Sequence, residues 1–414
     1  MAESIILTRT HEAAHRIFGD DALASSIAPK ALRARLAPDA AFGEDEQDSD
    51  LIRLKGGYVL MKAPGEAADL NRRLEVEVGA RAASELAVDS NRRLRSIAPM
   101  LTEIGVNGSR ELPWNLKAVG IVEDRNQPTG KGAKVAILDS GFDFEHPDFQ
   151  SRPRNDDREG PGTPPVRPLD GTAGPDPRDE NGHGTHAGGI IAGPLRPVGA
   201  PRYGIAPDTE LLSVNIIDDQ LTNWNLLAGM VQAAESGAHV ISISVGSPRR
   251  ELHPTHSPLF ELVARILRDW YGTIIVAAAG NESNRRQQYT GPIIHPADCP
   301  SIVAVGAVNE RLDPALTSSG GICNQRTPTL VAPGVAILSS FLSTNGHAQS
   351  PYVVLNGTSS AAPHVAGVAA LWIEKGYRGN DLLQVLIHTA KPLGNGSRTP
   401  SRDFGFGLVQ APRS

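Results

Sequence analysis

The segment Val135-Ala136-Ile137-Leu138-Asp139-Ser140-Gly141 begins with four apolar residues in succession and then turns polar. A short, continuous apolar run of this kind is typical of a strand buried on both faces of a parallel sheet. In open α/β sheets, ligands and catalytic groups gather at the carboxyl ends of the strands, which is where Asp139 would lie. The segment therefore predicts an α/β fold with a parallel sheet and a functional site at the carboxyl end of this strand.

Further runs of this kind follow along the chain, separated by stretches of helical length. The runs are Leu211–Ile217, Val240–Val245, Ile274–Ala279 and Ile302–Val305, and the expected helices are Asn225–Ser236, Leu259–Trp270, Val365–Glu374 and Asp381–His388. Strands that alternate with helices indicate βαβ units. We therefore expect residues 111–414 to form an α/β domain in which helices flank both faces of a mainly parallel sheet.

Residues 1–110 read differently and are rich in Arg, Glu and Ala. Helical spacing at Ala68–Val88 and a short apolar run at Tyr58–Met61 predict a smaller α+β region. An arginine-rich stretch, Arg92–Arg95, is either a helix end or an exposed processing site. We favour the helix end, because charge runs are usually solvated faces of regular structure.

Composition excludes several classes of protein. The 414 residues include 40 Lys and Arg against 46 Asp and Glu, for a net charge of −6, whereas a protein that coats nucleic acid needs a basic excess. Hydrophobic residues make up 40% of the chain, enough for a sizeable core. No run approaches the roughly 18–20 apolar residues that span a bilayer.

Cysteine usage and the first residues bear on the compartment. Cys299 and Cys323 are too few for a disulfide framework, and we expect buried or incidental thiols rather than a pair. The segment Met1–Arg9 lacks a basic start and an adequate apolar stretch, so we expect a cytoplasmic protein. A secreted protein from which a leader had been trimmed would read the same way.

Two polar segments supply a candidate carboxylate and a candidate base. Asp139 ends a predicted buried strand, so its carboxylate needs a hydrogen-bonding or cationic partner. His183 lies between glycines in Asn181–Gly189, which leaves its ring uncrowded. The pair His183 and His186 does not match the i, i+4 spacing and third ligand of a helical zinc site. We expect His186 to be a packed helix residue.

Two further segments supply a candidate oxyanion donor and a candidate nucleophile. Val276–Gly280 is a strand of small residues that ends before Asn281, whose amide could donate to developing negative charge. The stretch Asn356–Gly367 places Ser359 at the start of a helix of small residues, where backbone N–H groups favour negative charge. Taken alone, the Asn281 segment could be an ordinary Gly-Asn turn, and Ser359 could be a serine that only caps the helix.

Three motifs, Asp139-Ser140-Gly141, His183-Gly184-Thr185-His186 and Gly357-Thr358-Ser359, occur in this order along the chain. With the Asn281 segment they supply a nucleophile, a base, an orienting carboxylate and an oxyanion donor. In residues and order they resemble the subtilisin-like serine proteases (subtilases, peptidase family S8). The resemblance extends over residues 111–414 and implies the three-layer α/β sandwich of that family.

The resemblance implies a role for each of these residues. Ser359 is the expected nucleophile, His183 the general base and then acid, and Asp139 the group that holds the imidazole in its tautomer. Asn281, together with the Ser359 backbone N–H, is expected to bind the oxyanion.

Two segments resemble the walls of the family's substrate cleft. Ser244, Val245 and Gly246 match the segment that pairs with the substrate backbone as an added strand, and Ala278, Ala279 and Gly280 match the opposite wall. The pocket between them should be lined by apolar or small groups. We expect a polypeptide substrate and neither nucleic acid nor membrane as a partner.

The resemblance also bears on residues 1–110. The stretch Glu111–Leu116 resembles the start of a mature subtilase, so residues 1–110 are expected to be a propeptide that assists folding and inhibits the enzyme. A cut between Arg92 and Glu111 would then release them. An accessory domain that binds a partner is the alternative.

Some positions depart from the family pattern. Ser360 stands where many relatives have methionine, so the nucleophile lacks an oxidisable neighbour. Asp148 matches a carboxylate that helps hold calcium, but the loop Gly193–Arg202 offers few oxygen ligands and two positive charges. We expect no cofactor, and no metal at this position. A calcium site elsewhere in the chain is the alternative. Ser151–Asp179 is expected to be a surface loop.

Taken together, the sequence predicts a serine endopeptidase that hydrolyses peptide bonds through an acyl-enzyme. A specialised maturase or an acyl-transferring peptide ligase is an alternative, because both use the same acyl-enzyme and differ in what attacks it. A catalytically silent binding scaffold is a third reading, and the intact set of candidate residues counts against it.

Overall fold

The computed structural model describes most of the chain from Glu111 onward and short segments before it. The described residues are 3–9, 51–54, 58–64, 87–90, 93–96, 100–102, 111–153, 165–169, 178–217, 221–247, 256–321, 326–343, 350–394, 396 and 399–413.

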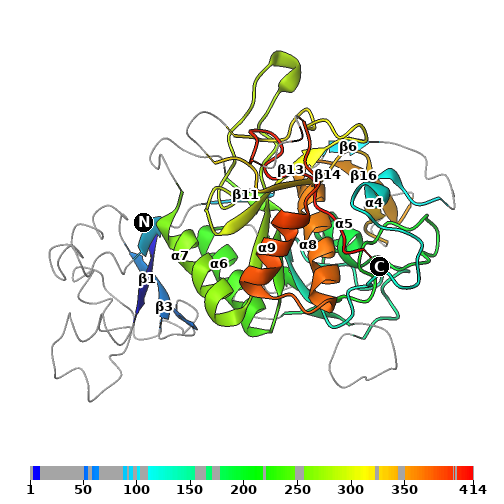
Figure 1. Cartoon of the computed structure of the whole chain (residues 1–414). Coiled ribbons are helices and arrows are strands. Elements are labelled where there is room, and N and C mark those ends of the chain that lie inside the picture. Colours follow the sequence, from blue (N-terminus) through cyan, green and yellow to red (C-terminus); the bar gives the residue numbers. More distant parts are fainter. Residues whose placement is uncertain are drawn as a thin grey trace, which may run out of the picture.

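A seven-stranded parallel sheet forms the centre of the molecule, in the order β14-β13-β12-β10-β7-β9-β8 (Figure 1). The strands are β7 (Lys134–Asp139), β8 (Val166–Pro168), β9 (Glu210–Asn215), β10 (Val240–Ile243), β12 (Ile274–Ala278), β13 (Ile302–Val308) and β14 (Leu330–Pro333). The expected parallel α/β sheet is thus confirmed. The expectation of a loop at Ser151–Asp179 is wrong in part, because β8 lies there and pairs with β9 at the edge of the sheet.

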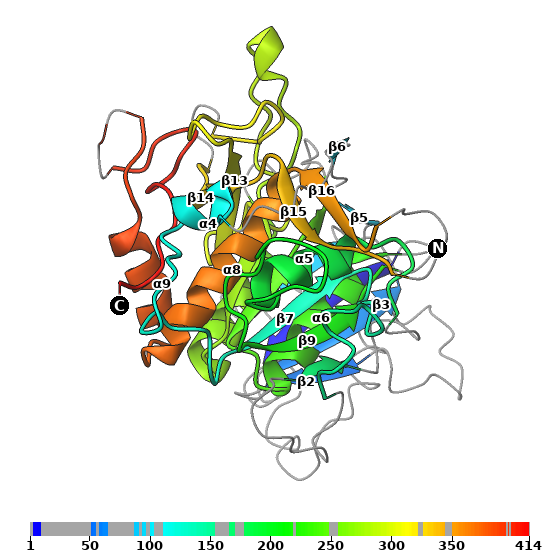
Figure 2. The same ribbon diagram turned by 90° about the vertical axis from the view of Figure 1, so that its right-hand side faces the viewer.

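Helices cover both faces of the sheet (Figure 2). On one face lie α5 (His183–Ala192), α8 (Thr358–Glu374) and α9 (Gly379–Thr389), and on the other lie α6 (Asn223–Glu235) and α7 (Pro258–Ile266), which continues as a π-helical turn over Leu267–Tyr271. Alternate residues of one strand enter the two cores: Val135 and Ile137 of β7 pack with the first group, and Ala136 and Leu138 with the second. Period-two alternation explains why the strands are apolar throughout.

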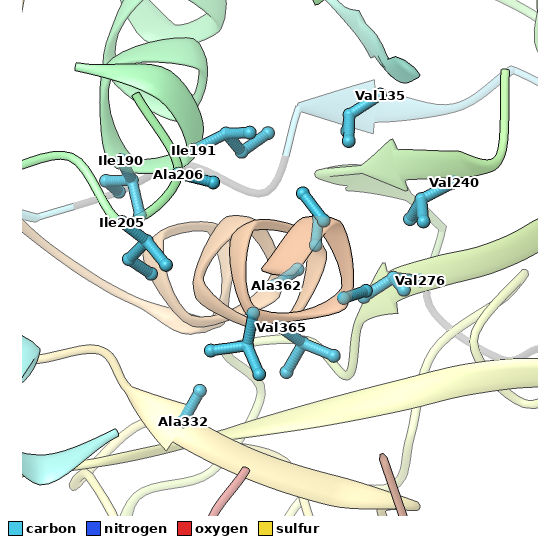
Figure 3. Close-up of a cluster of buried hydrophobic side chains, with 14 of the residues drawn as sticks. Val135, Ile190, Ile191, Ile205, Ala206, Val240, Val276, Ala332, Ala362 and Val365 are labelled. Carbon is cyan, nitrogen blue, oxygen red and sulfur yellow. The ribbon is translucent and has the colours of Figure 1, made fainter. Parts of the chain in front are cut away.

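Helix α8 runs through the first of these cores, as Figure 3 shows for Ala362 and Val365. Every residue from Thr358 to Leu371 is buried. An apolar helix that is buried on all sides needs small residues for close approach, and the alanines of this helix supply them. The helix begins seven residues before the expected start at Val365 and contains Pro363 in its second turn, where proline is normally disfavoured.

A smaller antiparallel sheet precedes the main domain, in the order β2-β3-β1-β4. Its strands are β1 (Glu3–Arg9), β2 (Leu51–Leu54), β3 (Tyr58–Pro64) and β4 (Ala87–Ser90). Ile5 and Leu60 of this sheet belong to the same hydrophobic core as the buried residues of α6 and α7. The helix expected at Ala68–Val88 is wrong at its end, where Ala87 and Val88 pair with β1, and its remainder lies outside the described residues.

Two short strands then pair with the main domain. Strand β5 (Arg95–Ser96) pairs antiparallel with β11 (Val245–Gly246), and β6 (Met100–Thr102) pairs antiparallel with β16 (Tyr352–Asn356), which also pairs with β15 (Ile337–Ser340). The helix end expected in Arg92–Arg95 is therefore wrong over its described residues. The segment is extended because Arg95 pairs with Gly246 at the unpaired edge of β11 and Arg93 forms an isolated antiparallel bridge with Thr222. Within the described part of the chain, no helix has the length and apolar character to cross a membrane.

Candidate active site

Asp139 and His183 are joined by a hydrogen bond at the carboxyl end of the sheet. Asp139 is the last residue of β7 and His183 the first of α5, and Nδ1 of the imidazole lies 2.7 Å from Oδ1 of the carboxylate. The same oxygen accepts a hydrogen bond from the Ser140 backbone N–H at 2.8 Å. Both side chains are buried. The predicted carboxylate and base are therefore in contact.

A second aspartate, Asp179, fixes the start of α5. One carboxylate oxygen accepts from the Gly182 N–H at 2.8 Å, and the other accepts from the Thr185 N–H at 2.8 Å and from the Thr185 hydroxyl at 2.7 Å. The first oxygen, Oδ1, also accepts from the Ser140 hydroxyl at 2.8 Å, which ties the start of α5 to the end of β7. The sequence analysis missed this residue. Asp179 lies three residues before the N-cap residue Gly182, and an aspartate so close to a helix start, where free N–H groups need acceptors, is the signal that could have found it.

The surroundings of His183 stabilise its protonated form. Burial alone would lower the pKa of its imidazole, but the charge of Asp139, the hydrogen bond with it and the charge of Asp179 together raise that pKa above the ordinary value. The ring is therefore a stronger base than a free histidine. It can accept a proton from a neighbouring hydroxyl and hold it.

Two other buried histidines near the site stay neutral. Nε2 of His186 lies 3.1 Å from the Ile337 carbonyl oxygen, and burial together with the charge of His183 lowers the pKa of His186 to about 3. Burial lowers the pKa of His364 to about 4, and its two ring nitrogens face the Ser360 carbonyl and the Asn115 amide. The packed role expected for His186 agrees with these contacts.

Ser359 lies in the first turn of α8, where the helix departs from regular hydrogen bonding. Pro363 has no N–H to donate to the carbonyl of Ser359 four residues earlier. The hydroxyl of Ser244 donates to this carbonyl instead, at 3.1 Å. Ser244 precedes β11, so the bond holds the turn that carries Ser359 against one predicted wall of the cleft. Ser359 Oγ is buried and has no hydrogen-bond partner among the described residues.

Asn281 is oriented by the residue before the serine. Its Oδ1 accepts from the Thr358 N–H at 3.0 Å and from the Thr358 hydroxyl at 3.1 Å, so its Nδ2 group points the other way. A Cβ on Gly357 would stand 2.8 Å from Asn281 Nδ2 and 3.1 Å from Ser359 Oγ. One point therefore lies within hydrogen-bonding reach of both groups. The absence of a side chain on Gly357, at φ +148°, leaves that point open.

The structure places both predicted walls beside the serine and adds a third side. Ser244 contacts the Ser359 backbone, and Val245 and Gly246 form β11. Opposite them, Ala278, Ala279 and Gly280 lead to Asn281; the two alanines are buried, and the Gly280 N–H donates to the Thr358 hydroxyl at 3.2 Å. Ile294 and His295, which the sequence analysis missed, bridge the two walls. Nothing in the local sequence marks this segment, because its position depends on distant partners.

The position expected to hold calcium in relatives does not fit that ion here. Asp148 Oδ2 accepts from the hydroxyls of Tyr203 at 2.7 Å and Tyr352 at 2.9 Å, and Oδ1 accepts from the Val198 N–H at 2.7 Å. Both carboxylate oxygens are thus bound by protein donors. Calcium takes six to eight oxygen ligands, and hydrogen-bond donors surround this carboxylate instead.

A different group of side chains has metal-binding atoms close together. Ligand atoms of His295, Asp298 and Cys299 lie within 4.8 Å of one another. Burial, with the charges of Asp298 and Glu261, raises the pKa of the Cys299 thiol well above its ordinary value. The thiol is therefore protonated, whereas zinc binds the thiolate. Cys299 is unpaired and buried, and Cys323 lies outside the described residues.

Comparisons with known proteins agree with this geometry. The profile of the subtilase family matches residues 130–407. Subtilisin Savinase of Lederbergia lenta is 32% identical over 308 residues, which cover 73% of this chain and 98% of that protein. The intracellular serine protease of Paenibacillus polymyxa is 30% identical over 299 residues, which cover 69% and 82%.

A solved structure shows the same fold. Fervidolysin from Fervidobacterium pennivorans, described as a keratinolytic enzyme related to subtilisin, has a TM-score of 0.69 and 20% sequence identity. The match covers 99% of this chain and 60% of the fervidolysin chain, so the present chain spans less than two thirds of it.

Proposed function

This chain belongs to the subtilase family of serine proteases, and we propose that it hydrolyses internal peptide bonds through Asp139, His183 and Ser359. The observation that carries this assignment is the 2.7 Å contact between His183 Nδ1 and Asp139 Oδ1. A buried carboxylate on one ring nitrogen leaves the other nitrogen as the proton acceptor for the serine.

In the proposed reaction, Ser359 Oγ attacks the carbonyl carbon of the scissile bond and His183 Nε2 takes the hydroxyl proton. The carbonyl oxygen becomes negative, and Asn281 Nδ2 with the Ser359 backbone N–H stabilises it. His183 then gives the proton to the leaving amine as the C–N bond breaks. Water repeats the sequence on the acyl-enzyme and releases the acid, which restores Ser359.

A fluorophosphonate probe tests the nucleophile, because it labels only a serine that an adjacent base activates. We expect labelling at Ser359 in wild-type protein from which residues 1–110 have been released and none in Ser359→Ala, while Ser360→Ala, the matched neighbour, is still labelled. Absence of labelling in the wild type, together with absence of peptide hydrolysis, would support the scaffold reading instead. Analysis of the products with an added amine then distinguishes hydrolysis from acyl transfer.

We further propose that residues 1–110 inhibit the enzyme that follows them. Strand β5 binds the edge of β11, the predicted substrate strand, in the antiparallel direction. Strand β6 binds β16, which ends three residues before Ser359. The chain therefore occupies strand edges on both sides of the nucleophile, where a substrate would bind by β-augmentation.

The pairing of β5 and β6 narrows the window in which we expect the first cut. Ser96 is the last residue that pairs with β11, and Met100 is the first that pairs with β16. The interval between these two pairings is our candidate for the cut. The proposed cut lies there, inside the window Arg92–Glu111. The arginine-rich stretch is less well placed, because Arg95 is paired with β11, and the part of the window from 103 to 110 lies outside the described residues.

A further inference from the structure

The two walls of the cleft converge on one side chain, that of Ile294. A Cβ on Gly246 would lie 2.8 Å from Ile294 Cδ1, and a Cβ on Gly280 would lie 2.9 Å from Ile294 Cγ2. Different branches of the isoleucine thus face the two glycines. Ile294 is 1% exposed, so it fills the space between them.

Backbone hydrogen bonds hold Ile294 in this place. Its N–H donates to the Ala279 carbonyl at 3.0 Å, in one wall. The next residue, His295, exchanges two hydrogen bonds with Ser247, at 3.0 and 3.1 Å, at the end of the other wall. The backbone of this segment cannot move away without breaking bonds to both walls, and burial leaves the side chain no open space to rotate into, so it forms a fixed floor.

The floor lies next to the proposed reaction centre. Gly280 directly precedes Asn281, the proposed oxyanion donor, and Gly246 lies two residues after Ser244, which bonds the Ser359 carbonyl. The space between the glycines is therefore the space nearest the serine on the acyl side of the cleaved bond. The substrate residue whose carbonyl is attacked (P1) places its side chain there.

We propose that Ile294 makes this P1 pocket shallow and restricts the enzyme to cleavage after glycine, alanine and serine. This inference rests on the proposed function and names its substrate class. A longer P1 side chain needs the volume that the isoleucine methyl groups occupy, and packed sites tolerate added methylene groups poorly. One methylene group in a hydrophobic pocket changes specificity by about 10- to 200-fold.

The first experiment measures kcat/KM of the wild-type protein, after self-processing, for peptides that differ only in P1, with concentrations normalised to fluorophosphonate-reactive serine. We expect alanine to exceed leucine and phenylalanine by at least about 100-fold. Equal or better cleavage after phenylalanine, by enzyme that is labelled at Ser359, would overturn the pocket inference and leave the proposed function intact. Absence of both labelling and cleavage would instead overturn the proposed function and this inference with it.

The second experiment opens the pocket. Ile294→Ala should raise kcat/KM for leucine relative to alanine by at least about tenfold. Ile293→Ala is the matched control, because Ile293 is equally buried but packs in the other core, and it should keep the wild-type ratio. If Ile294→Ala does not fold, Ile294→Val removes one methylene group and should shift the ratio in the same direction. An unchanged ratio in a folded Ile294 variant would overturn the inference.

Discussion

Gly184 and Gly141 touch so closely that no side chain fits between them: a Cβ on Gly184 would lie 2.1 Å from the Gly141 carbonyl oxygen. Gly184 follows His183 in α5, and Gly141 lies two residues after Asp139 at the end of β7. This contact therefore sets how closely the imidazole approaches its carboxylate. The close packing of the α5 backbone against the end of β7 is thus part of the proposed catalytic geometry.

Gly184→Ala should separate α5 from β7 and lengthen the 2.7 Å bond between His183 and Asp139. A misplacement of about 1 Å in a catalytic group lowers the rate by about 100-fold, and overpacking costs about 1–3 kcal/mol of stability. Gly199→Ala is the control, because its nearest atom beyond its neighbours would be 3.4 Å away. Wild-type kcat in a folded Gly184→Ala enzyme would contradict this prediction.

The pH profile of kcat/KM should show the raised pKa of His183. The base is active when deprotonated, so activity is present above this pKa and lost below it, and the acid limb should lie above the ordinary histidine value of about 6.5. Asp139→Asn removes the charge that raises the pKa. Its acid limb should move to lower pH while kcat falls by about 10⁴-fold. An acid limb at the same pH in both enzymes would argue against this coupling.

Asn281→Ala should lower kcat by about 10²- to 10³-fold with little change in KM, because its hydrogen bond forms mainly in the transition state. Asn281→Asp is the sharper comparison: it keeps an acceptor for the two Thr358 bonds but replaces the donor with a negative charge. It should reduce kcat at least as much. A change confined to KM in both variants would mean that Asn281 contacts the substrate in the ground state.

Self-processing should shorten the wild-type chain by about 95–100 residues, the size of a small folding unit. Ser359→Ala should stay at full length, because the cut requires the nucleophile. N-terminal sequencing of the product locates the bond, which we expect between Ser96 and Met100. The separated segment should inhibit when added back. Full-length wild type that cleaves peptides would identify residues 1–110 as an accessory domain.

Chelation by EDTA should change the Tm only modestly, because Asp148 is bound by Tyr203, Tyr352 and the Val198 N–H. A fall of more than about 10 °C would imply several kcal/mol of metal binding and contradict this. Asp148→Ala should lower the Tm to the same extent with and without calcium. The loss reflects two buried hydroxyls without their acceptor, about 1–3 kcal/mol each.

The sequence alone determined the parallel sheet and the candidate triad. Strands buried on both faces must be apolar throughout, so a strand such as Val135–Leu138 can be identified from its own consecutive residues. The candidate carboxylate, base and nucleophile each stand where such a run ends or a helix of small residues begins. These signals need only neighbouring residues, because backbone geometry and side-chain chemistry are local.

Tertiary structure alone decided what surrounds these residues. The pairing of β5 with β11, the hydrogen bond from the Ser140 hydroxyl to Asp179 and the place of Ile294 between two glycines each join segments distant in sequence. The Arg92–Arg95 stretch shows the difference: its charges suggested a helix end, but an open strand edge elsewhere in the chain made it extended. Backbone groups at a strand edge can pair with any segment that the fold places beside them, because this pairing does not depend on side-chain identity. The sequence pattern therefore does not predict which segment pairs there.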